Sequence, residues 1–178
     1  MPLTLLLGGA GAGKSQLAVR MAAGRRLPVV VIATAEARDG EMADRIRRHR
    51  ESRPSEWATI EEPLELRATL SRVPEDALVL IDCLTLWVSN LLERGLSDDD
   101  ILEQAAAAAS LAASREAGTI VVSNEVGSGV VPANALARRY RDLLGKVNAV
   151  WAEVADLASL VVAGRILPLA DPEDLGHG

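Results

Sequence analysis

Short apolar runs that alternate with longer segments of helix-forming residues constrain the fold of this chain more than any other feature. Such runs occur at residues 3–7, 28–33, 57–60, 77–81, 119–123 and 159–163. Most of them lack the alternation of apolar and polar residues that marks a half-exposed strand, which is typical of parallel strands covered on both faces. The sequence therefore predicts an α/β fold with a mainly parallel sheet and helices on both faces.

The segments between these runs predict the helices. They are expected at residues 14–23, 39–52, 63–71, 84–93, 97–118 and 134–156, the last with a break near Asn148. In this scheme the run at residues 159–163 is the last strand. No internal repeat or linker divides the chain, so we expect one domain over residues 1–166 and a loosely ordered acidic tail over residues 167–178.

Composition excludes several classes of protein. The chain has 178 residues and a net charge of −6, so a broad nucleic-acid interface, which needs a basic surface, is not expected. Its one cysteine, Cys83, cannot form an internal disulfide, which fits a reducing compartment. No apolar run approaches the ~20 residues of a membrane span, and the N-terminus lacks the basic start of a signal peptide. We therefore expect a cytoplasmic protein.

The strongest motif is Gly8-Gly-Ala-Gly-Ala-Gly-Lys-Ser15, which matches the phosphate-binding pattern G-x-x-x-x-G-K-[S/T]. It lies between a predicted strand and a predicted helix, as this motif requires. Its glycines let backbone N–H groups face phosphate oxygens, and the helix N-terminus adds a favourable dipole. Lys14 is expected to reach the β- and γ-phosphates of a nucleoside triphosphate, and the Ser15 hydroxyl to bind Mg²⁺.

Residues that follow predicted strands are expected to meet at one edge of the sheet, where ligands of such sheets bind. These residues are Gly8, Ala33, Asp82 and Asn124. Asp82 ends an apolar run, where an acidic residue that holds or orients Mg²⁺ is expected in a protein with a phosphate loop. The alternative for Asp82 is a turn or helix cap, which is the commoner role of a lone aspartate after a strand.

Residues 45–53 place five arginines around His49 in an otherwise acidic chain. His49 shares a helical face with Met42 and Ile46, so its ring is expected to point inward or into a cleft. Neighbouring guanidinium groups oppose protonation of the imidazole and leave a nitrogen lone pair for nucleophilic attack, and they would also stabilise phosphoryl charge. The alternative is a solvated helix face with ion pairs between the arginines and nearby acidic residues.

Two further stretches have open interpretations. Glu61 and Glu62 precede Pro63, and such acidic pairs are usually surface loop. The alternative is a carboxylate that accepts hydrogen bonds from guanine or helps to hold the metal. Residues 123–132 contain glycines and polar side chains that suit either a shaped loop at the active edge or a simple excursion before a salt-bridged helix.

Taken together, these motifs closely resemble the bifunctional adenosylcobinamide kinase/adenosylcobinamide-phosphate guanylyltransferase family of cobalamin biosynthesis. The matching pieces are GGAGAGKS (8–15), IAT (32–34), D-x-E-M-x-x-R-I-x-x-H-R-x-x-R-P-x-x-W (39–57), T-x-E (59–61), D-C-L-T-L-W-V-S-N-L-L (82–92), S-N-E-V-G-x-G-V-V-P (123–132) and A-R-x-Y-R-D-x-x-G-x-V-N (137–148). A phosphate loop alone is shared by many enzymes, so the middle and late motifs make the resemblance specific. In the loop, Gly11 and Ala12 stand where the family usually has Arg and Ser.

The resemblance implies a P-loop NTPase fold of the RecA-like kind and two reactions that use ATP or GTP with Mg²⁺. The first phosphorylates the aminopropanol hydroxyl of adenosylcobinamide, a corrinoid. The second transfers GMP from GTP to a histidine, releases pyrophosphate and passes GMP to adenosylcobinamide phosphate, which gives adenosylcobinamide-GDP. Members of the family are similar to one another in forming trimers, so a homotrimer is implied here.

The resemblance also implies roles for residues of this chain. The guanylylated histidine falls on His49, and Lys14, Ser15 and Asp82 keep the roles expected of them above. The nucleotide contacts fall on Gly8, Gly9, Ala10, Gly11, Ala12, Gly13, Lys14, Ser15, Thr34, Ala35, Glu36, Arg50, Glu51, Ser52, Arg53, Glu61 and Asp82.

Two other functions remain as alternatives. A monofunctional P-loop kinase for a small molecule explains the loop and Asp82 but gives His49 no role. A nucleotide-binding switch or assembly ATPase would use the arginine-rich helix as a surface for a partner. A covalent adduct formed from GTP would distinguish the bifunctional enzyme from both.

Overall fold

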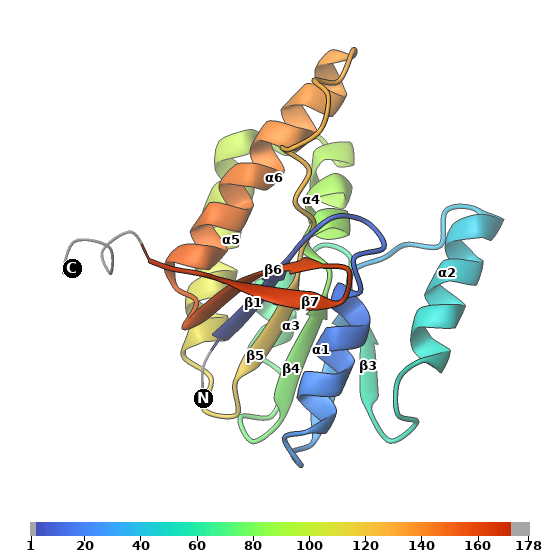
Figure 1. Cartoon of the computed structure of the whole chain (residues 1–178), viewed down its shortest axis with the longest axis vertical. Coiled ribbons are helices and arrows are strands. Elements are labelled where there is room, and N and C mark those ends of the chain that lie inside the picture. The colour runs from blue at the N-terminus through green and yellow to red at the C-terminus, as the bar shows by residue number, and fades with distance from the viewer. Residues whose placement is uncertain (1–2, 172–178) are drawn as a thin grey trace.

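One seven-stranded sheet forms the centre of the computed structural model, which describes residues 3–171 (Figure 1). The strands are β1 (Leu3–Leu7), β2 (Val29–Ala33), β3 (Ala58–Glu61), β4 (Leu78–Asp82), β5 (Thr119–Val122), β6 (Leu157–Val162) and β7 (Arg165–Leu169). Their order across the sheet is β3-β2-β4-β5-β1-β6-β7, and all neighbours are parallel except β6 and β7. The predicted mainly parallel α/β sheet is confirmed.

The register of the central strands aligns their carboxyl ends. Ala33 at the end of β2 lies opposite Asp82 of β4, Asp82 lies opposite Val122 of β5, and Val122 lies opposite Leu6 of β1. The segments that follow these strands therefore begin side by side at one edge of the sheet, where ligands of parallel α/β sheets bind.

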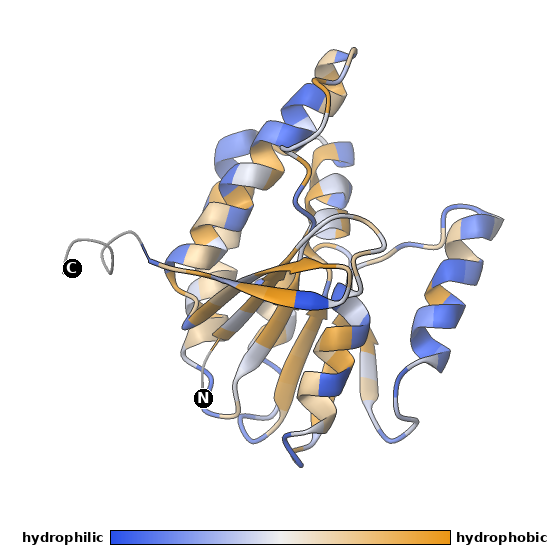
Figure 2. Cartoon of the chain, viewed as in Figure 1, coloured by the Kyte–Doolittle hydropathy of each residue, from blue (hydrophilic) through white to orange (hydrophobic). Residues whose placement is uncertain are grey.

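Six helices accompany the sheet within the described residues. They are α1 (Lys14–Ala23), α2 (Gly40–Glu51), α3 (Leu66–Leu70), α4 (Leu84–Glu93), α5 (Asp98–Ala113) and α6 (Ala135–Glu153). α1 packs against one face of the sheet through Leu17 and Ala18. The larger core lies on the other face, where α3 to α6 enclose Trp87 and Trp151. The sheet is accordingly the most hydrophobic part of the fold (Figure 2).

α2 differs from the other helices because none of its residues is buried. It stands beside the β3 edge of the sheet (Figure 1), and its surface is mostly hydrophilic (Figure 2). Asp39 caps its start, where the carboxylate accepts a hydrogen bond from the N–H of Met42 at 2.7 Å. α2 is thus held by polar contacts rather than by core packing.

The prediction that residues 159–163 form the last strand is wrong, because β7 follows β6 and pairs with it antiparallel. Ala163 and Gly164 both have positive φ, as a tight hairpin turn requires. Pro168 is tolerated because β7 is an edge strand. The domain boundary expected at residue 166 therefore falls inside a strand, and residues 172–178 of the expected tail lie outside the described residues.

The expected break in the last helix is also wrong, because α6 continues through Asn148. The Asn148 side chain faces inward, donates to the carbonyl of Asn124 at 2.9 Å and accepts from the Ser123 hydroxyl at 2.6 Å. Its polar groups are satisfied by the sheet edge, so they do not compete with the helix backbone. Within residues 3–171, no helix is both long enough and apolar enough to cross a membrane.

Candidate active site

The phosphate loop is braced by its neighbours. A Cβ on Gly8 would lie 2.4 Å from the carbonyl oxygen of Val161 in β6, so β6 leaves room for a glycine only. The N–H of Gly164, in the turn between β6 and β7, donates to the carbonyl of Ala12 at 2.9 Å. The hairpin that the sequence did not predict therefore supports the loop from the side.

Lys14 already lies inside the loop. Its Nζ donates to the carbonyls of Gly8 and Gly9, each at 2.8 Å, and its side chain is only 6% exposed. Burial lowers the pKa of Lys14 from its ordinary value, because an ammonium group is costly to desolvate. Phosphate oxygens are stronger partners for this group than neutral carbonyls, so a bound triphosphate would take over its hydrogen bonds.

Asp82, the last residue of β4, joins three elements. Its Oδ1 accepts a hydrogen bond from the Ser15 hydroxyl at 3.5 Å, and its Oδ2 lies 2.8 Å from Arg53 Nη2 and 3.5 Å from His49 Nδ1. Burial alone would raise the pKa of Asp82, but the hydrogen bond with His49 and the charge of Arg53 outweigh it and lower that pKa. The carboxylate is therefore ionised at neutral pH.

The donor set of the loop fits Mg²⁺. Within residues 3–171, no three His, Cys, Asp or Glu side chains cluster as a complete metal site. Nucleotide-bound Mg²⁺ does not need such a cluster, because it takes one or two protein oxygens together with phosphates and water. The Ser15 hydroxyl and the Asp82 carboxylate are hard oxygen ligands 3.5 Å apart at the start of α1. They are the residues that would hold the ion.

A cavity of about 350 Å³ lies between the phosphate loop, α2 and the ends of β2, β3 and β4. α2 lines it at helical spacing with Met42, Arg45, Ile46 and His49. The expectation that His49 points into a cleft is confirmed, although its side chain remains 38% exposed. The alternative interpretation, a solvated helix face with ion pairs, holds for the outer face of α2, where Arg47 pairs with Asp44 and Glu51.

Most of the residues predicted to contact nucleotide line this cavity. They are Ala10, Gly11, Ala12, Gly13, Lys14, Ser15, Ala35, Arg50, Arg53, Glu61 and Asp82, together with His49. Ala33 and Asn124, expected at the same edge, line it too. The predicted residues that do not line it are Gly8, Gly9, Thr34, Glu36, Glu51 and Ser52.

Six residues that line the cavity were missed by sequence reasoning: Gln16, Thr59, Cys83, Thr85, Leu86 and Val122. Thr59 could have been found, because it lies two residues before Glu61 on one strand and therefore shares its face. Thr85 and Leu86 lie in the first turn of α4, shortly after Asp82. They belong to the matching piece at residues 82–92, but that piece did not single them out as contacts.

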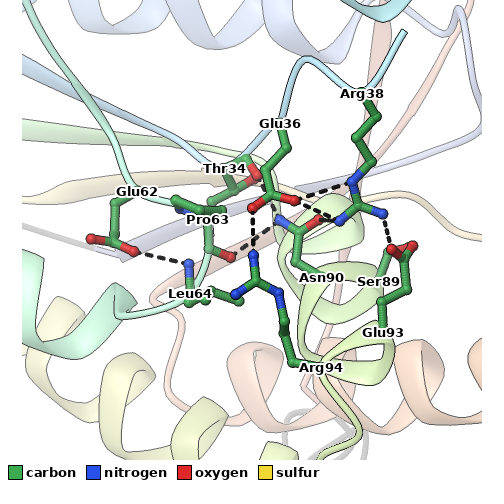
Figure 3. A network of polar contacts seen from close by, with 10 residues as sticks. All are labelled: Thr34, Glu36, Arg38, Glu62, Pro63, Leu64, Ser89, Asn90, Glu93 and Arg94. Atoms are coloured by element: carbon green, nitrogen blue, oxygen red, sulfur yellow. Dashed lines mark hydrogen bonds and ion pairs between the residues drawn. The ribbon is translucent and has the colours of Figure 1, made fainter.

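Thr34 is fully buried and holds the backbone behind the cavity. Its hydroxyl donates to the carbonyl of Cys83 at 2.6 Å and accepts from the N–H of Cys83 at 2.9 Å. Its own carbonyl accepts from Asn90 Nδ2 at 2.8 Å, and the same amide group donates to the carbonyl of Pro63 at 3.2 Å (Figure 3). The ends of β2 and β4 are thus tied to each other and to α4.

Glu36 belongs to an ion-pair network outside the cavity (Figure 3). Its carboxylate lies 2.7 Å from Arg38 and 3.1 Å from Arg94. Arg38 also pairs with Glu93 and donates to Asn90 Oδ1 at 2.7 Å. These contacts attach the segment between β2 and α2 to α4, so they fix the position at which α2 begins. A direct contact of Glu36 with nucleotide stays a prediction.

The two acidic residues before Pro63 have different roles. Glu62 accepts hydrogen bonds from the N–H groups of Leu64 and Glu65 at 2.9 and 2.8 Å, so it shapes the turn that leads into α3. Glu61 ends β3, lines the cavity and lies 3.8 Å from Arg50. Glu61 is thus placed to meet a ligand, and the contact with guanine stays a prediction.

Only the start of residues 123–132 belongs to the site. The N–H of Asn124 donates to the Thr85 hydroxyl at 2.8 Å, which fixes Asn124 at the cavity. Glu125 accepts hydrogen bonds from the hydroxyl and N–H of Ser128, at 2.8 and 3.3 Å, and these bonds lower its pKa. Glu125 therefore stabilises its own exposed turn, and the two interpretations of this segment each hold for one part of it.

Comparison with known sequences gives close matches over nearly the whole chain. A family model described as cobinamide kinase / cobinamide phosphate guanyltransferase matches residues 4–169. The chain is 48% identical over 168 residues to the bifunctional adenosylcobalamin biosynthesis protein CobP of Pseudomonas aeruginosa, with 93% of this chain and 95% of the relative covered. It is 38% identical over 176 residues to CobU of Salmonella typhimurium, with 91% and 96% covered.

Comparison with solved structures concerns the fold alone, because the sequence identity is 11% in both cases. A protein of Pyrococcus horikoshii has a TM-score of 0.56 and covers 98% of this chain and 88% of its own. An ATPase of the type III secretion system of pathogenic bacteria has a TM-score of 0.58, with 98% of this chain and 60% of the ATPase covered. The predicted P-loop NTPase fold is confirmed.

Proposed function

This chain belongs to the cobinamide kinase / cobinamide phosphate guanyltransferase family of cobalamin biosynthesis, and we propose that it performs both reactions of that family through one cavity. In the first, ATP or GTP phosphorylates the aminopropanol hydroxyl of adenosylcobinamide. In the second, GMP from GTP is transferred to His49 and then to adenosylcobinamide phosphate, which yields adenosylcobinamide-GDP. Pyrophosphate leaves when the GMP–histidine bond forms.

One observation carries the proposal: His49 lies at the phosphate loop, with Nδ1 3.5 Å from Asp82 Oδ2. A histidine that served only the surface of α2 would not share a cavity with Lys14 and Ser15. A kinase that transfers phosphate directly needs no imidazole there. The arrangement suits an enzyme in which the ring attacks the nucleotide that the loop holds.

Asp82 would orient His49 for this attack. When Nδ1 carries the proton and faces the carboxylate, the lone pair of Nε2 is free to attack the α-phosphorus of GTP. The P–N bond forms while the bond between the α-phosphorus and the bridging oxygen breaks, and that electron pair leaves with pyrophosphate. The ring then bears a positive charge, which Asp82 stabilises across the 3.5 Å contact.

The second half of the transfer regenerates His49. A phosphate oxygen of adenosylcobinamide phosphate attacks the same phosphorus, the P–N bond breaks and the ring keeps its pair of electrons. In the kinase step the substrate hydroxyl attacks the γ-phosphorus directly, and Lys14 offsets the charge on the transferred group. Mg²⁺ held by Ser15 and Asp82 would supply further charge stabilisation on the phosphates.

We also propose that the enzyme is a cytoplasmic homotrimer. The support in the fold is the β7 edge, whose five residues are all exposed and include Ile166, Leu167 and Leu169. An apolar edge strand left open to water tends to pair with another surface. The resemblance to a family of trimers supplies the number of subunits.

The central experiment is the intact mass of the protein after incubation with GTP and Mg²⁺. The wild type should gain one GMP through a bond that is labile in acid and stable in base, as expected of P–N and not of a serine ester. His49→Asn should gain none, although it should still phosphorylate adenosylcobinamide. An adduct on His49→Asn would place the nucleophile elsewhere, and a wild type without adduct but with kinase activity would be a monofunctional kinase.

A further inference from the structure

The arginines of residues 45–53 differ in what they contact. The contacts are Arg47 with Asp44 at 2.9 Å, Arg48 with the carbonyl of Asp44 at 3.3 Å, Arg50 with Glu61 at 3.8 Å and Arg53 with Asp82 at 2.8 Å. Within residues 3–171, Arg45 is the one arginine of this stretch with neither a hydrogen bond nor an ion pair. Its guanidinium group is therefore available to a ligand.

Arg45 faces the cavity rather than the outer surface of α2. It lines the cavity together with Lys14 and Ser15 of the loop, and it precedes His49 by one helical turn on the same face. One turn advances the helix by about 5.4 Å. Arg45 and His49 are therefore about as far apart along α2 as the α-phosphate is from the far end of a triphosphate.

The electrostatics of the free protein favour an anion at this point. Lys14 and Arg45 both have cationic side chains, and both line the same cavity. Two cations that face one cavity without a carboxylate partner for Arg45 repel each other until a multiply charged anion lies between them. Among the loop residues Gly8–Ser15, Lys14 is the only one with a cationic side chain, so the loop alone offers few charges to a leaving pyrophosphate.

We propose that Arg45 binds the β- and γ-phosphates of GTP from the α2 side and stabilises pyrophosphate as it leaves during guanylyl transfer. The inference rests on the proposed function of His49. As the bond from the α-phosphorus to the bridging oxygen breaks, negative charge grows on the pyrophosphate between Arg45 and Lys14. The planar guanidinium can donate two parallel hydrogen bonds to phosphate oxygens, which one ammonium group cannot do.

In this proposal α2 carries both the nucleophile, His49, and the group that stabilises the leaving pyrophosphate, Arg45. His49 and Arg45 lie on the same face of α2, which no buried side chain attaches to the core. The position of α2 relative to the loop therefore brings both groups to the triphosphate together.

Binding of inorganic pyrophosphate tests the inference without any reaction. Calorimetric titrations of Arg45→Ala with pyrophosphate and with GTP should show affinities about ten- to a hundredfold weaker than those of the wild type, because a charge-assisted hydrogen-bond pair is lost. The affinity for GMP should be unchanged, since GMP lacks both phosphates. Arg47→Ala on the outer face of the same helix is the matched control and should behave as the wild type.

Single-turnover guanylylation, followed by intact mass, tests the effect on the leaving group. Arg45→Ala at saturating GTP should form the GMP adduct about tenfold more slowly or worse, and Arg45→Lys should recover part of that rate. Because Arg45 is exposed, both variants should melt at the temperature of the wild type.

The outcomes separate this inference from the proposed function. Unchanged pyrophosphate affinity in Arg45→Ala, or equal losses for GMP and pyrophosphate, overturns the role of Arg45. A wild type that forms no adduct overturns the histidine intermediate. The pyrophosphate titration then still decides whether Arg45 binds the two outer phosphates.

Discussion

Thr34 uses one hydroxyl group for two hydrogen bonds to the same residue, since it donates to the carbonyl of Cys83 and accepts from its N–H. Valine, which has the same shape, can make neither bond. These bonds hold the backbone immediately after Asp82, so they set the direction of the carboxylate that faces Ser15 and His49. At the scale of single residues, the site depends on buried partners of the reactive groups as much as on the groups themselves.

Cys83 gives a prediction about pH. Burial and the nearby charge of Asp82 raise the pKa of its thiol from 9.0 to about 11. At pH 8 the native thiol should therefore react with iodoacetamide about a hundredfold more slowly than the same thiol in the urea-unfolded chain, because less thiolate is present. The chain has one cysteine, so the mass of the modified protein measures this rate directly.

The raised pKa of the Cys83 thiol also determines how the free energy of unfolding changes with pH. The folded state holds the thiol proton more tightly, so its contribution to folding is fully present below pH 9 and is lost as the pH rises toward 11. Equal alkylation rates in the folded and unfolded chain would contradict the raised pKa. A Cys83→Ala variant, which has no thiol, should lose less stability than the wild type between these pH values; the rest of the loss comes from Tyr140, whose pKa is also raised by burial.

At the scale of elements, α2 depends on the attachments at its two ends. The Arg38 network fixes the chain before α2, and the ion pair of Arg53 with Asp82 fixes the chain after it. Asn90 is the buried centre of the first attachment, because it contacts Thr34, Pro63 and Arg38 at once. A helix held in this way can shift without disturbing the core.

Asn90→Leu should therefore lower the free energy of unfolding by about 1–3 kcal/mol, because it leaves buried carbonyls and a guanidinium without partners. Limited proteolysis should also cut residues 34–39 faster, since their attachment to α4 is lost. Urea unfolding and the rate of cleavage measure the two effects. Ser89→Ala, one residue earlier on α4, is the control and should change both little; a similar loss there would contradict the special role of Asn90.

The sequence predicted those parts of the site that are local in the chain. The loop Gly8–Ser15 and Asp82 were found because the chemistry fixes both their spacing and their place after a strand. Asn90 could not be found, because its partners Thr34 and Pro63 are 56 and 27 residues away. β7 was missed because it contains Pro168, which interrupts the pattern of a strand, and because all of its residues are exposed rather than buried.

At the scale of the whole molecule, the sheet has one open edge that is apolar. β7 lies at the end of the strand order, and its Ile166 and Leu167 side chains are 46% and 58% exposed. The β6–β7 turn also supports the phosphate loop through Gly164 and Ala12. Assembly at this edge would therefore place a neighbouring subunit next to the elements that shape the nucleotide site.

For the proposed trimer, Leu167→Lys should shift the equilibrium toward monomer, because a charge on an edge strand opposes pairing. Light scattering after size-exclusion chromatography measures the mass in solution. Glu103→Lys, an exposed charge change on α5, serves as the control and should leave the mass unaltered. A trimer that persists in Leu167→Lys would assign the interface to another surface.

Because α2 adds no side chain to the core, folding does not depend on the residues that α2 contributes to guanylyl transfer. Substitutions at His49 should remove transfer while leaving the melting temperature where it was. A substitution at Gly8 should instead lower the melting temperature, since any Cβ there meets the backbone of β6. A screen that ranks variants of this enzyme by thermal stability would therefore detect damage to the phosphate loop and pass over inactive variants of α2, so such variants must be sorted by adduct formation.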